Sequence, residues 1–274
     1  MLTAAEGYLR ERDVEVPRLS VEWMFASVLG VSRLEVYMAH DRPLADAEKQ
    51  RMREMVSRRG RGEPLAYILG DQEFCGQRFK VTPAVLIPRP GTEELVSLAA
   101  DRAPDGGRGA DLGTGSGAIA VALCMSRPDV TMVATDVSVE ALAVAAENAE
   151  ILGVADRIEF RQGSWWGPLG REHLDFVVSN PPYVDSAHPE LLARDVREYE
   201  PAVALFPSEG VSQAYKELVH GTEGMPSGAP VIFETGVGAS DTGLEVMRGA
   251  SWLTEVELRE DEAGLPRYLL ARRR

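Results

Sequence analysis

Residues 111–117 read Asp-Leu-Gly-Thr-Gly-Ser-Gly, and this stretch decides the fold class. A short apolar run, residues 110–112, leads into it, and the small-residue run 118–126 continues it with helical character. Glycines at such a turn let the backbone bend tightly and approach a ligand. The start of a helix adds unpaired N–H groups that suit an anion. The stretch therefore predicts a strand, a glycine loop and a helix, with a ligand site at the loop.

A carboxylate further along the chain strengthens this prediction. Asp136 follows the β-branched run 130–135, a position that suits hydrogen bonds to ribose hydroxyls. The glycine spacing is GxGxG rather than the GxGxxG of dinucleotide enzymes, which favours a nucleoside without a pyrophosphate. S-adenosylmethionine carries a carboxylate, an ammonium and a sulfonium, and the acidic Asp111 beside the loop suits such a cationic ligand. The alternative is a glycine turn that only joins a strand to a helix.

Outside the loop, strands and helices alternate. This alternation indicates a parallel sheet with helices on both faces. The strand candidates are residues 110–112, 130–135, 158–161, 176–178 and 231–233. The tail differs, because strand-like runs at 253–258 and 268–271 flank the turn-rich residues 261–266, which predicts a terminal antiparallel hairpin.

The first 70 residues lack strand alternation and predict a small helical module. Gly30 is a plausible helix stop, and the charged run 46–59 carries Met52 and Met55 at helical spacing. Residues 71–89 suit two short strands and a turn. We therefore expect an N-terminal helical domain over 1–70, a hairpin-like connector over 71–90 and an α/β domain over 91–274.

The helix after the connector also carries predictions. Pro88 and Pro90 should stop any strand ladder. Thr92 could then cap the following helix, whose first turn is acidic.

A second motif, Asn-Pro-Pro-Tyr at residues 180–183, follows the apolar strand 176–178. Ligands of open parallel sheets bind at the carboxyl ends of the strands, so the motif should face the same crevice as the glycine loop. Two prolines stiffen it, Asn180 offers one acceptor oxygen and two donor hydrogens, and Tyr183 offers an aromatic face. The alternative is an ordinary Asn-Pro turn.

This set of groups suits a planar –C(=X)–NH2 group. An amide nitrogen is a poor nucleophile, and acceptors for both N–H hydrogens would hold it in line with a methyl carbon. The same acceptors would stabilise the positive charge that develops on nitrogen. We therefore take Asn180, Pro181, Pro182 and Tyr183 as the candidate catalytic residues, with no dedicated His or carboxylate base.

The composition excludes several classes of protein. The net charge of −14 makes a general nucleic-acid binder improbable, although the arginine-rich residues 51–61 leave a local basic patch open. The two cysteines and four histidines share no metal-ligand spacing, so we expect no metal site. No signal peptide or membrane-spanning stretch is visible, which predicts a cytoplasmic protein.

At this point the chain resembles the bacterial release-factor glutamine methyltransferases, the HemK/PrmC family. Asn-Pro-Pro-Tyr alone is shared with adenine methyltransferases. More specific segments are Gly-Glu-Pro-Leu-Ala-Tyr-Ile-Leu-Gly at 62–70, Leu-Ile-Pro-Arg-Pro at 86–90, Thr-Glu-Glu-Leu-Val at 92–96 and Asp-Val-Arg at 195–197.

The resemblance implies a seven-stranded Rossmann-like methyltransferase sheet and the cofactor S-adenosylmethionine, with S-adenosylhomocysteine as product. Asp136 would hold the ribose, Trp165 would pack near the adenine, and Asn180 would touch both cofactor and substrate. Pro181, Pro182 and Tyr183 would hold the substrate. The methionine part would lie against Gly113, Thr114, Gly115, Ser116 and Gly117.

The implied substrate is the glutamine of the Gly-Gly-Gln motif of peptide chain release factors, which the N-terminal domain would help dock. We expect a monomer that binds neither nucleic acid stably nor a membrane. Gly91 and Ser164 depart from the family pattern, which has Asp at both positions. The Ser164 departure bears on the adenine contact.

Alternative functions stay open on the sequence. They are methylation of a glutamine in a ribosomal protein, and methylation of an adenine amino group in nucleic acid. Two further carboxylates can be interpreted without a role in the site. Glu234 fits a solvated carboxylate as well as a site residue, and Glu200 fits a surface ion pair with Arg197.

Overall fold

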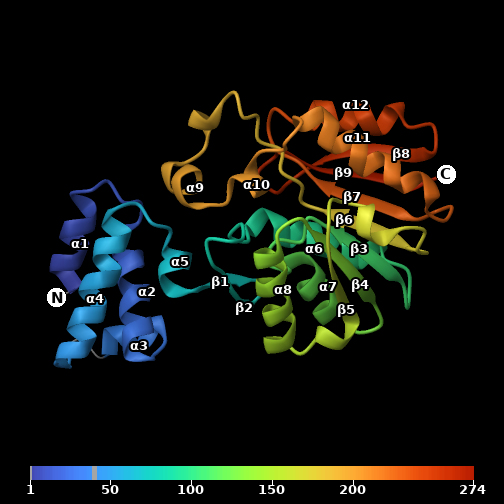
Figure 1. Cartoon of the computed structure of the whole chain (residues 1–274). Helices are drawn as coiled ribbons and strands as arrows, with labels where there is room; N and C mark the ends of the chain where they lie inside the picture. The colour runs from blue at the N-terminus through green and yellow to red at the C-terminus, as the bar shows by residue number, and fades with distance from the viewer. Residues whose placement is uncertain (1, 39–41) are drawn as a thin grey trace. The chain divides into compact units, whose positions relative to one another are not determined.

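The computed structural model describes residues 2–38 and 42–274, so that His40 lies outside the described residues (Figure 1). The chain forms two compact units. One contains residues 1–71 together with 192–199, and the other contains 72–191 together with 200–274. The division that we expect from the sequence lacks this returning segment. Within the described residues, no helix combines the length and the apolar character needed to cross a membrane.

The N-terminal unit is helical, as predicted. Gly30 takes a left-handed conformation with φ of 65° and ends the second helix. Met52 and Met55 are buried in the core of this unit. Its helices are α1 (Leu2–Arg10), α2 (Pro17–Leu29), α3 (Arg33–Met38), α4 (Asp46–Gly60), α5 (Leu65–Leu69) and the returning α9 (Arg194–Tyr199).

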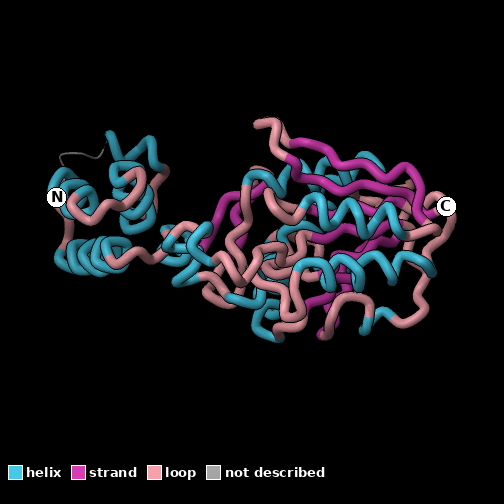
Figure 2. The backbone as a smooth tube through the Cα atoms, turned by 90° about the horizontal axis from the view of Figure 1, so that it is seen from above, coloured by secondary structure: helices cyan, strands magenta, loops and turns pink. Residues whose placement is uncertain are grey.

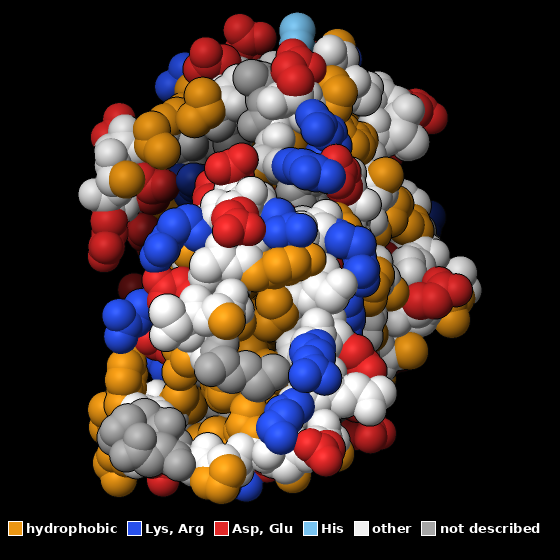
Figure 3. Space-filling view, turned by 90° about the vertical axis from the view of Figure 1, so that its left-hand side faces the viewer, with side chains coloured by type: hydrophobic (Ala, Val, Ile, Leu, Met, Phe, Trp, Pro, Cys, Tyr) orange, Lys and Arg blue, Asp and Glu red, His pale blue; other side chains and the backbone are white. Residues whose placement is uncertain are grey.

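The arginine-rich segment 51–61 belongs largely to α4 and pairs with acidic groups. Arg58 Nη2 lies 2.5 Å from Glu63 Oε1, and Arg59 Nη1 lies 3.9 Å from Asp195 Oδ2. Figure 3 shows Lys and Arg side chains interspersed with Asp and Glu on the face that it presents. Arg58 and Arg59, two of the five arginines of this segment, are thus paired with acidic side chains.

The connector forms a two-stranded sheet of β1 (Asp71–Phe74) and β2 (Gln77–Lys80), as predicted. The Phe74 and Phe79 rings meet edge to face with 5.6 Å between centroids, and both are fully buried.

A seven-stranded sheet with the order β5-β4-β3-β6-β7-β9-β8 forms the second unit (Figure 2). Neighbours from β5 to β7 are parallel, whereas β9 is antiparallel to both β7 and β8. The predicted α/β sheet and its terminal hairpin are therefore confirmed. The strands are β3 (Arg108–Leu112), β4 (Thr131–Asp136), β5 (Ile158–Gln162), β6 (Phe176–Ser179), β7 (Pro230–Glu234), β8 (Leu253–Glu260) and β9 (Pro266–Arg273).

Helices cover both faces of this sheet (Figure 1). On one face lie α6 (Pro90–Arg102), α7 (Ala118–Ser126) and α8 (Val139–Ile151), and on the other lie α11 (Val211–Gly221) and α12 (Ser240–Gly249). Ser138 caps α8 by accepting the Ala141 N–H at 3.0 Å. The shorter helices are η1 (Ala155–Arg157), η2 (Gly167–Leu169), η3 (Pro189–Leu191), α10 (Ala202–Leu205) and η4 (Thr222–Gly224).

The strand order creates a switch point at β3. The chain runs outward from β3 to β4 and β5 on one side, and to β6 and β7 on the other. At such a point, the loops after neighbouring strands diverge and leave a crevice at the carboxyl edge of the sheet. The loops after β3, β4 and β6 carry the glycine motif, Asp136 and the Asn-Pro-Pro-Tyr motif, so the topology gathers them at one edge.

Two local predictions are wrong. Thr92 does not cap α6, because α6 already begins at Pro90 with Arg89 as the flanking residue, and Thr92 is buried. Glu200 does not lie on the surface with Arg197. It is buried, accepts the Ile87 N–H at 3.1 Å and pairs with Arg89, which ties the end of the connector to the segment after α9 within the second unit.

Candidate active site

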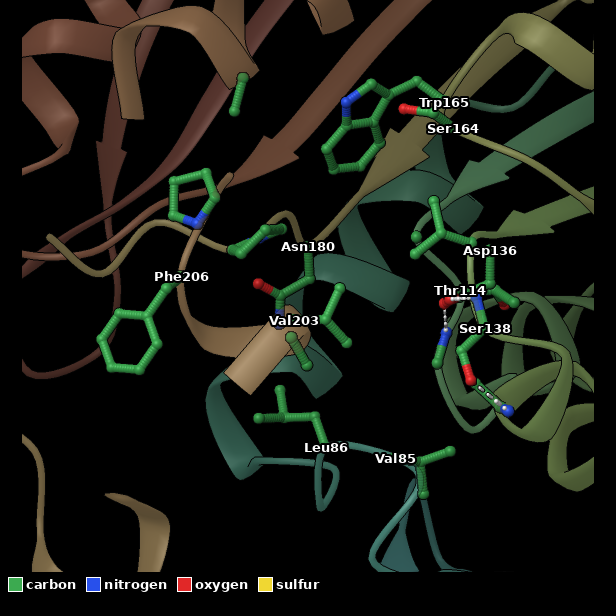
Figure 4. A pocket seen from close by; sticks show the side chains of 18 of the residues that line it. Val85, Leu86, Thr114, Asp136, Ser138, Ser164, Trp165, Asn180, Val203 and Phe206 are labelled. Atoms are coloured by element: carbon green, nitrogen blue, oxygen red, sulfur yellow. Dashed lines mark hydrogen bonds between the residues drawn. The ribbon is translucent and has the colours of Figure 1, made fainter. Parts of the chain in front are cut away.

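A cavity of about 710 Å³ lies at the carboxyl edge of the sheet (Figure 4). This volume is in the range of pockets that hold a nucleoside-sized ligand. The loops after β3, β4, β5 and β6 contribute to its wall, together with residues 84–92 and 202–209. Eight of the residues predicted for the site line it: Gly113, Thr114, Gly115, Ser116, Asp136, Trp165, Asn180 and Pro182.

The glycine loop is anchored to β4. The N–H groups of Gly113 and Thr114 both donate to the carbonyl of Thr135, at 2.8 and 2.9 Å. Gly115 has φ of 57°, and a Cβ placed on it would meet no atom within 4 Å, so its Cα faces open space. A ligand can therefore approach the backbone closely there.

Gly117 serves another purpose. Its φ is 78°, and a Cβ placed on it would lie 3.0 Å from the Ala145 Cβ. Gly117 lies outside the cavity wall, and its missing side chain allows α7 to start close against α8.

Asp136 lines the cavity with its carboxylate fixed by backbone. Oδ2 accepts the Gly115 N–H and Oδ1 accepts the Ser138 N–H, each at 2.9 Å. A carboxylate has about four lone-pair sites, so two acceptor positions remain for ligand hydroxyls.

Asp111 lies beneath the loop and outside the cavity wall. Its Oδ2 accepts the Thr114 hydroxyl at 2.6 Å and the Ala120 N–H at 3.2 Å, while Oδ1 has no hydrogen-bond partner among the described residues. Burial raises the pKa of Asp111 to about 7, against the opposing effect of these two hydrogen bonds. Its contact is therefore with the loop itself, rather than with the space in which a ligand would sit.

Asn180 projects into the cavity from the end of β6 (Figure 4). Its Nδ2 donates to the Thr92 hydroxyl at 3.2 Å. Because the amide nitrogen is held by Thr92, the oxygen of the same amide is the group left to accept a hydrogen from a ligand.

The other three residues of the tetrapeptide differ in whether they reach the cavity. Pro182 lines the cavity, whereas Pro181 and Tyr183 do not. The Tyr183 ring packs over Gly236, where an added Cβ would come within 2.6 Å of the ring. Burial raises the pKa of Tyr183, and its hydroxyl is hydrogen-bonded to Arg267. Tyr183 thus supports the motif from behind.

Trp165 and Ser164 line the cavity after β5 (Figure 4). The Trp165 carbonyl accepts the Thr135 hydroxyl at 3.0 Å, and its φ of 44° is unusual for a side chain of this size. Trp166 instead donates from Nε1 to the Leu218 carbonyl at 2.9 Å, in a packing position. The pair therefore has one member at the cavity and one in the core.

The sequence alone did not indicate the contact of Thr92 with Asn180, and it left Glu234 open as either a solvated carboxylate or a site residue. Thr92 holds Asn180, and Glu234 is buried behind Thr92 with a pKa that burial raises to about 7. A carboxylate at the end of β7 was the available signal, but its burial depends on elements distant in the chain. The apolar residues Val85, Leu86, Val203 and Phe206 complete the wall.

A glycine loop, a fixed carboxylate and an Asn-Pro-Pro corner at the switch point of this sheet define a Rossmann-like methyltransferase. The fold agrees with that of the solved hMettl16 catalytic domain in complex with the MAT2A 3′UTR hairpin 6. That domain is 19% identical, with a TM-score of 0.58 over 83% of this chain and 82% of that one.

Family models match the "PrmC N-terminal domain" over residues 1–70 and the "Methyltransferase small domain" over residues 89–196. A release factor glutamine methyltransferase of Geobacter sulfurreducens is 42% identical, over 89% of this chain and 86% of the relative. One of Nitratidesulfovibrio vulgaris is 40% identical, over 100% of this chain and 94% of the relative. The chain therefore belongs to the release factor glutamine methyltransferase family.

Proposed function

We propose that this enzyme transfers a methyl group from S-adenosylmethionine to the side-chain amide nitrogen of the glutamine in the Gly-Gly-Gln motif of peptide chain release factors. The names of its relatives support the substrate protein. The observation that carries the proposal is the orientation of Asn180, whose amide nitrogen is bound to Thr92 while its oxygen is left for an N–H donor.

The residues present fit the cofactor. The open backbone at Gly115 suits the close approach of a methionine chain, and the Asp136 carboxylate suits the ribose hydroxyls. Trp165 offers an aromatic surface for the adenine. Thr114 and Ser116 of the glycine loop would contact the methionine part of the cofactor. When bound, the cofactor supplies a methyl carbon activated by the positive sulfur.

In the proposed reaction, a new bond forms between the glutamine nitrogen and the methyl carbon while the bond from that carbon to sulfur breaks. The sulfur leaves as a neutral thioether, and the nitrogen gains positive charge until it releases one proton to solvent. The Asn180 oxygen accepts an N–H hydrogen of the substrate and stabilises this developing charge.

The Asn-Pro-Pro-Tyr segment, residues 180–183, also positions the substrate. Pro182 limits the movement of the amide, with Pro181 and Tyr183 stiffening the segment around it. No side chain is required to take the proton directly.

We further propose that the enzyme acts in the cytoplasm as a monomer and does not bind nucleic acid stably. The N-terminal domain would dock the release factor, with the connector joining it to the catalytic domain. The matched charges around Arg58 and Arg59 support the absence of a nucleic-acid surface on α4.

Labelled methyl transfer tests the proposal. The purified chain is incubated with methyl-labelled S-adenosylmethionine and, separately, a release factor, a Gly-Gly-Gln to Gly-Gly-Glu variant of it, ribosomal proteins, and RNA or DNA. We expect label only in the unaltered release factor, and peptide mapping should place it on the motif glutamine. Label confined to a ribosomal protein or to nucleic acid would refute the proposal.

A further inference from the structure

A carboxamide and a carboxylate on α11 line the active-site cavity and have no part in the proposed chemistry. Gln213 and Glu217 both contribute to the cavity wall, four residues apart on one face of the helix. Gln213 Nε2 donates to Glu217 Oε1 at 3.0 Å, and both side chains are partly exposed. Among the described residues that line the cavity, Asn180 is the only other carboxamide, and the proposed reaction already uses it.

The loop after β5 joins this pair to the part of the cavity proposed for the adenine. The Trp165 indole lies against the glycine loop, since a Cβ placed on Gly113 would be 3.2 Å from its ring. The next residue, Trp166, donates from Nε1 to the Leu218 carbonyl of α11 at 2.9 Å. Trp165 also packs against the core cluster that contains Leu218. Leu218 directly follows Glu217, so the surface offered by Trp165 adjoins the segment of α11 that carries the pair (Figure 4).

The hydrogen bond within the pair fixes the direction of the Gln213 carboxamide. A carboxylate only accepts hydrogen bonds, so the end of Gln213 next to Glu217 is its NH2 group. That group has two hydrogens, and Glu217 takes one of them. The second hydrogen and the acceptor Oε1 are left for a ligand. A donor beside an acceptor is the complement of an adenine edge, where an amino group donates and the ring nitrogen beside it accepts.

We propose that Gln213 binds the edge of the adenine of S-adenosylmethionine, and that Glu217 is the positioning residue that fixes the direction of its amide. Gln213 Oε1 accepts from the amino group of the base, and Nε2 donates to the ring nitrogen beside it. The Nε2 hydrogen remote from Oε1 stays on Glu217. This inference rests on the cofactor of the proposed function, and it adds the means by which the chain distinguishes adenine from other purines.

The alternative is a pair that only supports its own helix. Gln50 and Glu54 on α4 form such a pair, with the same four-residue spacing and a 3.1 Å hydrogen bond. Both are exposed, and neither lines the cavity. The two pairs share their local geometry and differ in their place, so the α4 pair supplies matched controls.

Binding of two ligands to the full chain, measured by isothermal titration calorimetry, tests the contact without catalysis. One ligand is S-adenosylhomocysteine, and the other is S-inosylhomocysteine, in which a carbonyl oxygen replaces the amino group of the base. We expect the wild type to prefer the adenine ligand roughly 30-fold, within the range of one bidentate contact to a base. Gln213→Ala should weaken the adenine ligand about tenfold and change the inosine ligand less than about threefold. Gln50→Ala should leave both affinities unchanged.

The variant Glu217→Gln tests the direction of the amide. It replaces an obligatory acceptor by a group that can also donate, so the Gln213 carboxamide can turn and present Nε2 to the carbonyl of the inosine ligand. We expect that ligand to bind about fivefold more tightly than to the wild type, while the adenine ligand binds more weakly. A role confined to the helix would not produce a gain of affinity. Glu54→Gln is the control and should change neither affinity, and thermal unfolding close to that of the wild type shows that α11 is intact.

The outcomes separate this inference from the proposed function. Equal affinity of the wild type for the two ligands, or a preference that survives Gln213→Ala, would overturn the adenine contact. An unchanged preference in Glu217→Gln would overturn the positioning role of Glu217. Failure of the wild type to bind either ligand would overturn the cofactor assignment on which the inference rests. The expected preference without methyl transfer to a release factor would refute the proposed substrate and support the adenine contact.

Discussion

The Asp136 carboxylate and the Gly115 N–H are joined by a 2.9 Å hydrogen bond that crosses from the end of β4 to the glycine loop after β3. Ser138 N–H holds the other oxygen of the same carboxylate. The group therefore shapes the loop and, at the same time, faces the cavity. Replacing one carboxylate oxygen of Asp136 by an NH2 group removes the negative charge and one acceptor while keeping the shape of the side chain. Such a change tests how the group holds the loop and how it faces the cavity.

Asp136→Asn makes that change. The amide can accept from only one of the two backbone N–H groups, because its NH2 would face the other donor. We expect the affinity for S-adenosylhomocysteine to fall about 10- to 100-fold, since a hydrogen bond to a charged group contributes about 1.5–3 kcal/mol. Isothermal titration calorimetry measures this. Asp101→Asn, on the exposed end of α6, is the control, and an equal loss there would argue against a site role for Asp136.

Asn180→Ala should separate catalysis from cofactor binding. The substitution removes the oxygen that faces the substrate, so we expect methyl transfer to the release factor to fall about 100- to 1,000-fold. The affinity for S-adenosylhomocysteine should change less than tenfold. Single-turnover kinetics give the chemical step directly. Glu73→Ala, exposed on β1, should leave the rate unchanged. A full-rate Asn180→Ala variant would contradict the assigned role of the amide.

The strands and the glycine loop could be predicted because both are local. The strands are short apolar runs between turns, and the loop before Ala118 follows one of them directly. The approach of Asn180 to the cavity could also be predicted, since parallel strands end at one edge of the sheet.

The supports behind the site could not be predicted in the same way. Thr92 and Asn180 meet only after α6 packs against β7, the neighbour of β6, and a threonine three residues into a helix resembles a cap in sequence. Tyr183 turns away from the cavity because Gly236 leaves room for its ring. Glu234 and Glu200 look like surface carboxylates until the sheet and connector bury them. Each of these contacts joins segments that the sequence pattern treats separately.

Asp111 predicts an unusual dependence of stability on pH. Its pKa rises from an ordinary 3.8 to about 7 in the folded chain because it is buried. Between these values the folded state keeps a proton that the unfolded state has lost, so stability falls as pH rises from about 4 to about 7. Asp111→Asn removes this contribution. From pH 5 to pH 7, the variant should therefore gain on the order of 2 kcal/mol relative to wild type.

Guanidinium unfolding followed by tryptophan fluorescence at several pH values gives the difference between the two proteins. Asp101→Asn, at an exposed position, should keep the slope of the wild type. Parallel stability curves for Asp111→Asn and wild type would show that Asp111 titrates normally in the folded chain.

Gly109 and Phe176 form a paired position that limits what β3 can carry. They lie opposite each other in the parallel register of β3 and β6, and a Cβ on Gly109 would come within 2.2 Å of Phe176 Cζ. The ring is fully buried and cannot move outward without disturbing α6 and α7. Gly109→Ala should therefore destabilise the second unit by about 3 kcal/mol, at the upper end of overpacking costs.

Combined with Phe176→Leu, Gly109→Ala should cost at least about 1 kcal/mol less than the sum of the two single changes, because the smaller side chain leaves room for the methyl group. Thermal and chemical unfolding of the four proteins measure this coupling, and Gly249→Ala, where an added Cβ meets nothing within 4 Å, should be nearly neutral. Strict additivity of Gly109→Ala and Phe176→Leu would mean that the glycine is required for something other than the ring that lies over it.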